Sequence, residues 1–246
     1  MNTAWIIAKR ELNSFFDSLL AYIIMILFLV FTGFFTWLYG RDVFLVGEAS
    51  LQSFFGVAYW TLFFFIPALT MRLVAEEKHS GTLEMILTKP VNEWQFVLGK
   101  FMSIFILILI TLALTLPYYV TVSFIGPIDH GATITGYLGL ILLSATYTSI
   151  GIFASSVTSN QIVSFLLALF IGIFFHLLFG MLGNAFSGTT GNVLDYLSAS
   201  THYESISRGV IDSKDIIYYL TVIFLGLFGA EAILIGRNVT DNPKKQ

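Results

Sequence analysis

Long runs without Asp, Glu, Lys or Arg limit how this chain of 246 residues can fold more than any other feature. Three such runs occupy residues 18–40, 49–71 and 101–128, and they are 23, 23 and 28 residues long. A fourth run extends over 65 residues, from 130 to 194. The hydrocarbon core of a bilayer is about 30 Å thick, so roughly 20 apolar residues cross it as a helix. Each run is therefore long enough to cross a membrane.

Polar residues that interrupt the apolar sequence define the remaining spans. Polar residues from Ser155 to Asn160 divide the 65-residue run in two, and residues 216–236, broken only by Glu231, form one more span. Only 11% of the residues are charged, whereas a soluble domain has about a quarter. Continuous apolar runs also lack the alternation of a membrane β-barrel. We therefore predict an all-α integral membrane protein with one transmembrane domain, 1–246. Its six transmembrane helices are expected near 18–40, 49–71, 101–126, 134–154, 161–183 and 216–236.

The distribution of Lys and Arg predicts the orientation of these helices, because cytoplasmic loops carry an excess of both residues. Six spans place both termini on one side of the membrane, together with segments 72–100 and 155–160. That side holds nine of the 12 basic residues, and the other side holds Arg41, Arg208 and Lys214. We therefore predict cytoplasmic N- and C-termini.

Residues 1–17 precede the first span and have the pattern of an amphipathic helix. Helical spacing gives this helix one apolar face and places its charged residues, Glu11 among them, away from that face. Such a helix lies in the cytoplasmic membrane interface. It is either a docking element for a partner or a simple anchor, and the sequence leaves both open. The predicted apolar face consists of Trp5, Ala8, Leu12, Phe15 and Phe16.

The cytoplasmic segment 72–100 is predicted to contain a helix, a break and a second short helix. Gly81 weakens the first helix, because Gly costs about 1 kcal/mol relative to Ala inside a helix. An apolar stripe beginning at Leu83 follows, and Asn92 with Gln95 predicts the cap of the next helix. A short helix parallel to the membrane suits a groove on a cytosolic partner. An ordinary solvated loop with a charge cluster explains the same residues.

Residues 184–215 form the longest external segment. They combine several Gly and Asn residues with short apolar patches near 193–197 and 206–211. This composition fits an extracellular loop as well as it fits a short re-entrant or capping helix.

Several polar residues lie inside the predicted spans. His176 and Glu231 are ionisable, and such groups are functional candidates because their burial in lipid is costly. His176 could equally form a structural hydrogen bond to a neighbouring helix, and Glu231 could pair with Arg237 or reach the interface. Hydroxyl groups in the third and fourth spans could line a transport path or form interhelical hydrogen bonds. These hydroxyl residues are Thr111, Thr115, Ser144, Thr148 and Ser149.

Composition and motifs argue against other classes of function. A net charge of -3 without basic tracts argues against nucleic-acid binding. The chain has no Cys, and its four His residues are too scattered for an H-E-x-x-H zinc site, so no metal is expected. Gly99-Lys100 lacks the other residues of a phosphate-binding loop, and we identify no catalytic residue. The pair Glu76-Glu77 faintly resembles that of intramembrane prenyl-protein endopeptidases, which leaves a hydrolase as a minor alternative.

Motifs distributed along the chain resemble those of ABC-2 type transporter permeases. The first is Glu76-Glu77-Lys78-His79-Ser80-Gly81-Thr82-Leu83-Glu84, followed by Lys89-Pro90-Val91 and Val97-Leu98-Gly99-Lys100-Phe101. Gly151-Ile-Phe-Ala-Ser-Ser-Val-Thr-Ser-Asn-Gln-Ile and Ser207-Arg-Gly-Val-Ile-Asp are also similar to that family. Within it, the chain is most similar to the gliding-motility-associated branch.

The resemblance implies an ABC-2 exporter fold in a bacterial cytoplasmic membrane. It implies a dimer with an identical or related permease, and a separate cytosolic ABC ATPase that holds ATP and Mg, so that this chain binds no cofactor itself. The gliding branch further implies an auxiliary subunit with a periplasmic portion. A membrane scaffold that recruits cytosolic proteins without transport remains the main alternative. The ATPase-coupling residues implied by the resemblance are Glu76, Glu77, Lys78, Gly81, Thr82, Leu83 and Glu84.

Overall fold

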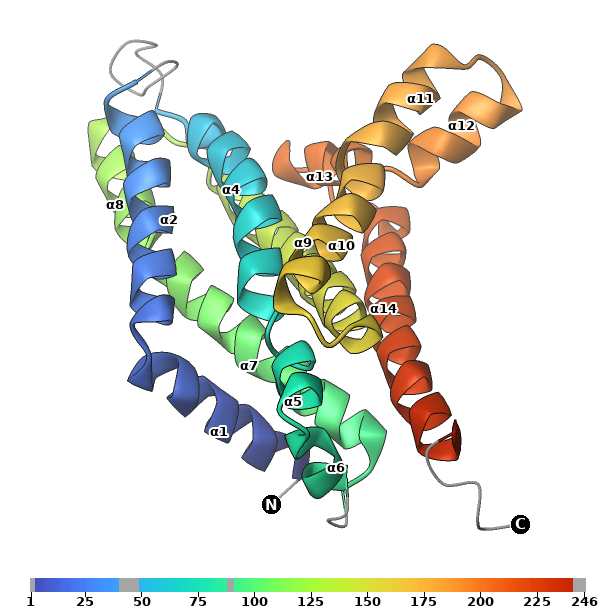
Figure 1. Cartoon of the computed structure of the whole chain (residues 1–246). Coiled ribbons are helices and arrows are strands. Elements are labelled where there is room, and N and C mark those ends of the chain that lie inside the picture. The colour runs from blue at the N-terminus through green and yellow to red at the C-terminus, as the bar shows by residue number, and fades with distance from the viewer. Residues whose placement is uncertain (1–2, 40–48, 88–90, 241–246) are drawn as a thin grey trace.

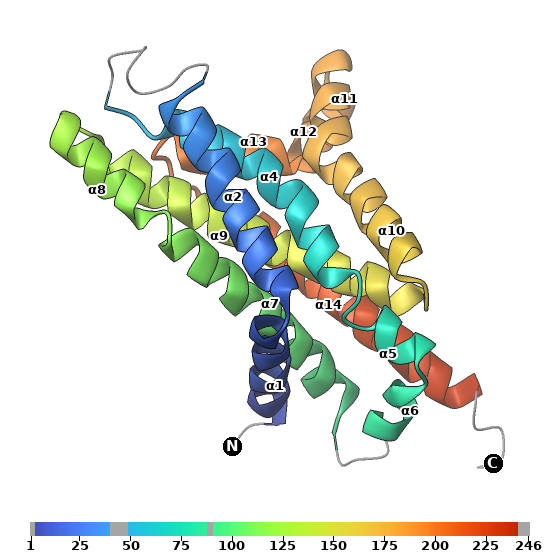
Figure 2. The same cartoon turned by 60° about the vertical axis from the view of Figure 1, so that its left-hand side comes forward.

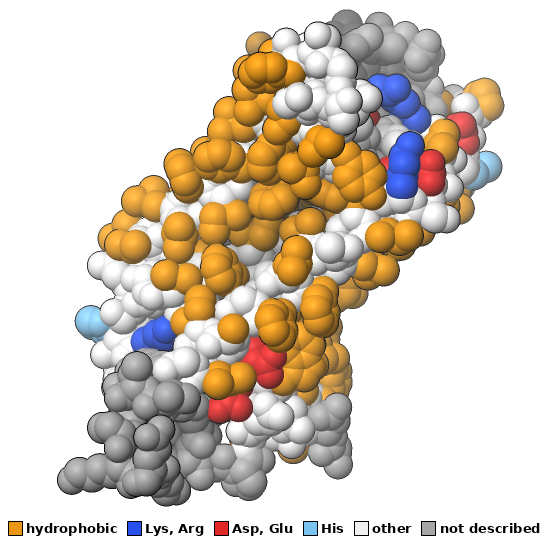
Figure 3. Space-filling view, turned by 90° about the vertical axis from the view of Figure 1, so that its right-hand side faces the viewer, with side chains coloured by type: hydrophobic (Ala, Val, Ile, Leu, Met, Phe, Trp, Pro, Cys, Tyr) orange, Lys and Arg blue, Asp and Glu red, His pale blue; other side chains and the backbone are white. Residues whose placement is uncertain are grey.

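The computed structural model describes residues 3–39, 49–87 and 91–240, and every regular element in these ranges is a helix. Six of the helical stretches are long and apolar enough to cross a membrane, which confirms the predicted number of spans. Figure 3 shows hydrophobic side chains over the middle of one face, with charged side chains toward its ends. This pattern is expected of a surface that contacts lipid. The six stretches are Leu19–Trp37, Gln52–His79, Glu93–Ile125, His130–Val157, Gln161–Ala185 and Ser213–Gly236.

The fourth span lies at the centre of the bundle. This helix, α9 (His130–Val157), packs against α4 (Gln52–Thr70), α10 (Gln161–Ile173) and α14 (Ser213–Thr240). Most of α9 is buried, whereas α10 and α14 expose much of their surface. The small and hydroxyl residues of α9 allow neighbouring helices to approach closely, as is typical inside membranes.

The helix of the third span begins before the predicted span, at the cap that the sequence predicts, and contains a break. Its first helix, α7 (Glu93–Ala113), starts eight residues before position 101, and the second, α8 (Leu116–Ile125), follows a turn at 114–115. Pro117 lies at the start of α8, where its missing N–H costs little. The predicted cap at the start of α7 is confirmed, because the Asn92 and Gln95 side chains each accept a hydrogen bond from the backbone at the start of the helix.

Two ends of the molecule can be distinguished. The start of α1 (Thr3–Asp17), the end of α14, and the short helices α5 (Ala75–His79) and α6 (Thr82–Leu87) lie at one end, here called the terminal face (Figures 1 and 2). The turn between α8 and α9 lies at the other end, called the opposite face. The remaining long helix, α2 (Leu19–Trp37), packs beside α4.

The segment 184–215, predicted to be external, forms helices and not a plain loop. The π-helix η1 (Phe174–Leu178) and α11 (Phe179–Ala185) continue the fifth span, and α12 (Thr189–Tyr196) returns beside α11. This helical pair projects from the opposite face (Figure 1). A further helix, α13 (Ala199–Ser207), packs on α9. Of the two alternatives from the sequence, the structure therefore favours short capping helices.

Candidate functional site

The break between α5 and α6 is a tight turn that depends on glycine. Gly81 has φ +70°, a left-handed conformation that is strained for most other residues. The Ser80 and Thr82 hydroxyls lie 2.8 Å apart across this turn. Leu83 is 1% exposed and anchors α6, while Glu76 and Glu84 are exposed on the surface. The predicted order of helix, break and short helix is therefore observed.

An ionic cluster joins this region to two other elements. Lys100 of α7 has its side chain only 2% exposed, and its Nζ lies 2.7 Å from Glu77 Oε1 on α5 and 3.1 Å from Glu11 Oε2 on α1. The Lys100 ammonium also lies 5.3 Å from the Phe96 ring centroid. A buried cation is tolerated when carboxylates compensate its charge. Lys100 therefore connects three elements far apart in the sequence.

Arg10 extends this cluster toward the surface, while Arg72 lies over an aromatic ring of α1. A terminal nitrogen of Arg10 lies 2.6 Å from Glu11 Oε1 and 3.4 Å from Glu77 Oε1, and its side chain is 53% exposed. The Arg72 guanidinium lies 4.6 Å from the centroid of the Phe15 ring. The cluster is thus buried at Lys100 and solvated at Arg10, so its outer part contributes less than its inner part.

The charge of Glu11 depends on these neighbours. Burial alone would raise the pKa of Glu11, but the Lys100 charge and hydrogen bonds from Arg10 and Lys100 outweigh burial, and the pKa falls below its usual range. Glu11 is therefore ionised over the whole neutral range.

The end of α9 holds the beginning of α5. Ser155 Oγ accepts hydrogen bonds from the backbone N–H groups of Val74, at 3.1 Å, and Ala75, at 3.0 Å. The same hydroxyl donates to the Met71 carbonyl at 3.0 Å. Lys78 Nζ donates to the carbonyl of Ser156. A displacement of α5 would therefore strain its hydrogen bonds to α9 as well as its ion pair with α7.

The structure corrects the predicted faces of the first helix. Glu11 was expected on the side away from the apolar face, but it contacts Lys100 on the side of α1 that packs against α7. The reason is that α1 packs on α7: a Cβ on Gly99 would lie 2.7 Å from Ile7 Cβ, so only glycine permits this approach. The Gly99-Lys100 pair thus combines a close helix contact with an ion pair.

Comparison with known proteins identifies the family. A family model described as ABC-2 family transporter protein matches residues 40–236, about four fifths of the chain. The chain belongs to the ABC-2 transporter family. It is a multi-pass membrane protein, and members of this family are the membrane permeases of transporters. No curated protein gave a sequence match.

The matched region contains only part of the permease's ionic cluster. Glu77 and Lys100 lie within residues 40–236, whereas Glu11 and the rest of α1 precede them. Sequence reasoning noted Lys100 only as part of a motif and as a basic residue near a span. Its carboxylate partners, Glu77 and Glu11, lie 23 and 89 positions away in the sequence. Helical periodicity cannot predict contacts between residues so far apart.

The hydroxyls proposed for a path in the permease are buried, and four of the five donate to backbone carbonyls. Thr111 and Thr148 donate to carbonyls four residues earlier in their own helices, and Ser149 donates to the carbonyl of Thr146. Thr115 Oγ1 lies 2.9 Å from Tyr137 Oη, and Ser144 Oγ is buried without a hydrogen-bond partner in the described part of the chain. In this conformation they are packed between helices.

The two ionisable residues within the permease's spans have different surroundings. His176, in η1, stacks on Tyr59 with 4.0 Å between ring centroids, and its Nδ1 lies 2.5 Å from Tyr147 Oη. Glu231 is half-buried on α14. The proposed pairing of Glu231 with Arg237 involves a side chain outside the described residues.

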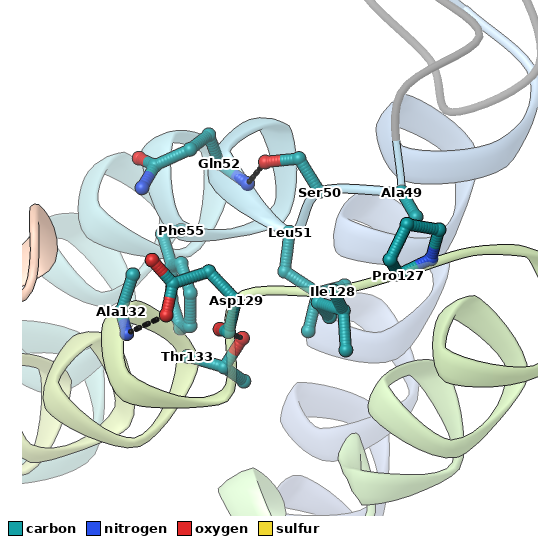
Figure 4. A pocket seen from close by; sticks show the side chains of 10 residues that line it. All are labelled: Ala49, Ser50, Leu51, Gln52, Phe55, Pro127, Ile128, Asp129, Ala132 and Thr133. Atoms are coloured by element: carbon teal, nitrogen blue, oxygen red, sulfur yellow. Dashed lines mark hydrogen bonds between the residues drawn. The ribbon is translucent and has the colours of Figure 1, made fainter.

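A pocket of about 430 Å³ lies at the opposite face, where α4 and α9 begin (Figure 4). Asp129 Oδ1 accepts a hydrogen bond from the Ala132 N–H at 3.0 Å and caps α9. The Gln52 N–H donates to Ser50 Oγ at 3.2 Å. These polar groups are therefore engaged in starting the two helices of the permease.

Proposed function

We propose that this permease is the membrane subunit of an ABC exporter in a bacterial cytoplasmic membrane. A separate cytosolic ATPase holds ATP and Mg and docks on the surface formed by α5, the Gly81 turn and α6. Closure of the ATPase pair displaces these helices, and the displacement changes the arrangement of the spans. The terminal face is then cytosolic, in agreement with the excess of Lys and Arg expected there.

The main support for this proposal is that the exposed α5–turn–α6 segment is fixed to the bundle by the buried Lys100 cluster. Glu77 on α5 shares Lys100 with Glu11, so a force on α5 reaches α7 and α1. Ser155 adds a second connection, to α9. A solvated loop without a partner would not require buried connections of this kind, which are costly to form.

Further parts of the proposal concern other subunits. Phe31 and Phe64 are 48% and 49% exposed on α2 and α4, where a second permease, identical or related, would pack. The projecting α11–α12 pair would contact an auxiliary subunit with a periplasmic portion. This last assignment and the link to gliding motility rest on the motif resemblance.

The test uses two substitutions of one residue. Gly81→Asn retains a residue type that tolerates the left-handed conformation, whereas Gly81→Pro imposes φ near −65°. We expect both variants to insert into the membrane, and only Gly81→Pro to lose ATPase copurification and substrate-stimulated ATP hydrolysis. Equal activity of the two variants would refute the coupling role of the turn.

The alternatives predict other results. A scaffold would bind cytosolic proteins without substrate-dependent ATP hydrolysis. A hydrolase would need Glu76 and Glu77 free for chemistry, but Glu77 is paired with Lys100. Among the described residues, no cluster of three His, Asp or Glu side chains could hold a metal.

A further inference from the structure

A second cavity, of about 620 Å³, lies toward the opposite face between α4, the η1–α11 segment and α13. It is separate from the ionic cluster at the terminal face. Trp60 and Met181 at its wall are 44% and 64% exposed, so the cavity is accessible from outside the bundle. Its size is that of pockets that hold small organic molecules.

Aromatic rings form one wall of this cavity. Tyr59 stacks on Tyr203 at 4.7 Å between centroids, and on its other side it stacks on His176. Trp60 meets His176 edge to face at 4.5 Å. These rings come from α4, η1 and α13, and aromatic faces attract organic cations.

The charged side chains of the cavity wall are carboxylates. Asp195 and Glu204 line it, and its wall contains no Lys or Arg. Glu204 is paired with Arg208 at 3.0 Å, whereas Asp195 accepts a hydrogen bond from Thr201 and has no ion pair within the described ranges. Asp195 is therefore the uncompensated negative charge.

His176 provides an independent sign that the wall is a binding surface. Its side chain is 1% exposed and lines the cavity, yet its Nε2 has no hydrogen-bond partner among the residues described. The residue lies in a π-helix, an irregularity found frequently at functional sites. A buried polar atom without a partner is costly, and a ligand group that reaches it would remove that cost.

We propose that this cavity binds an amphipathic organic cation. The cationic head lies against the Trp60 ring with Asp195 as counter-charge, and the apolar part extends along Met181 toward the lipid. An anion would face two carboxylates without a basic residue in the wall. A neutral molecule would leave Asp195 uncompensated. Binding at this cavity does not depend on the ATPase partner.

Binding can be measured on the purified permease in nanodiscs of zwitterionic lipid. The probes are hexylammonium, hexyl sulfate and hexanol, which share one alkyl chain, and empty nanodiscs correct for partition into lipid. Isothermal titration calorimetry should show saturable binding of the ammonium compound alone. Saturable binding of the sulfate with equal or higher affinity, or no saturable binding of any probe, would overturn the proposal.

Substitutions locate the site. Asp195→Asn keeps the acceptor for Thr201 and removes the charge, and it should weaken ammonium binding roughly fivefold. Trp60→Leu, at an exposed position, should weaken it by a similar factor. Asp212→Asn is the matched control, because Asp212 is an exposed carboxylate of the same region outside this wall, and it should change nothing. Equal effects of Asp195→Asn and Asp212→Asn would refute the assignment.

Discussion

Lys100 and His176 are both 1% exposed, yet the two ends of the molecule accommodate them in different ways. Lys100 is held by two carboxylates from other elements, whereas His176 is held by stacked rings and one tyrosine hydroxyl. The buried charge of Lys100 must remain paired with these carboxylates, because an unpaired buried charge is costly. Among the described residues, His176 takes part in no ion pair. Replacing one group around it should therefore lower the free energy of unfolding by less. The comparison shows that the surroundings of Lys100 connect distant elements through charge, whereas those of His176 pack rings beside a cavity.

The largest effect is expected where the charge compensation is broken. Lys100→Met leaves the Glu11 and Glu77 carboxylates close together without their buried cation, and should lower the free energy of unfolding by about 3–5 kcal/mol. Denaturation in detergent micelles, followed by circular dichroism, measures this loss. Adding Glu11→Gln and Glu77→Gln to Lys100→Met should recover most of it. An unchanged free energy of unfolding for Lys100→Met would mean that the ionic cluster does not hold α1, α5 and α7 together.

A smaller effect is expected at the aromatic end. His176→Phe keeps a ring in the stack and loses the hydrogen bond with Tyr147, so it should cost about 1 kcal/mol of stability. Tyr147→Phe removes the same hydrogen bond, and the double variant should cost little more than either single variant. The same denaturation assay tests this, and a loss as large as that of Lys100→Met would contradict the contrast drawn above.

The pH dependence of Glu11 sharpens the account of the cluster. Its folded-state pKa is lowered, so its stabilising contribution is complete above its unfolded value near 4.5 and is lost as the pH falls through the folded value. The difference in unfolding midpoint between the wild-type protein and Glu11→Gln, corresponding to about 1 kcal/mol at pH 7, should therefore shrink in acid. Thermal unfolding at several pH values measures it. A difference that grows as the pH falls would show that Glu11 is destabilised by its surroundings.

The smallest effect is expected for the hydroxyls within α9. Thr148→Val removes a hydroxyl that bonds only to its own helix, and should change stability by about 0.6 kcal/mol or less. Substrate-stimulated ATP hydrolysis should also be unchanged. A strong loss of that activity with normal stability would show that Thr148 lines the path in another conformation.

The sequence predicted the features that depend on local spacing. The six spans follow from apolar runs, the break at Gly81 from helix propensity, and the cap at Asn92 from its spacing to Gln95. Features that depend on contacts between distant segments could not be predicted. Glu11 was placed on the wrong side, because the contact with Gly99 and Lys100 decides how α1 is rotated.

The π-helix and the cavity illustrate the same limit. Nothing in the apolar run around His176 distinguishes a π-helix from an α-helix, since the irregularity is stabilised by rings from α4 and α9. The helix α13 buries Ala199, Tyr203 and Ile206 at helical spacing against α9, but the return of α12 beside α11 is a contact that no spacing in the sequence reports. Long-range packing therefore defines the opposite face.

Site-directed crosslinking tests the central claim most directly, because the natural chain contains no Cys. Thr82→Cys places a single reactive group on the exposed start of α6, and Ser187→Cys places one near the opposite face as the matched control. After crosslinking in native membranes, mass spectrometry identifies the attached protein. We expect Thr82→Cys to capture a cytosolic ATPase with a phosphate-binding loop, and Ser187→Cys to capture none. Failure of Thr82→Cys to capture any nucleotide-binding protein, or its capture from Ser187→Cys, would contradict the proposed docking surface.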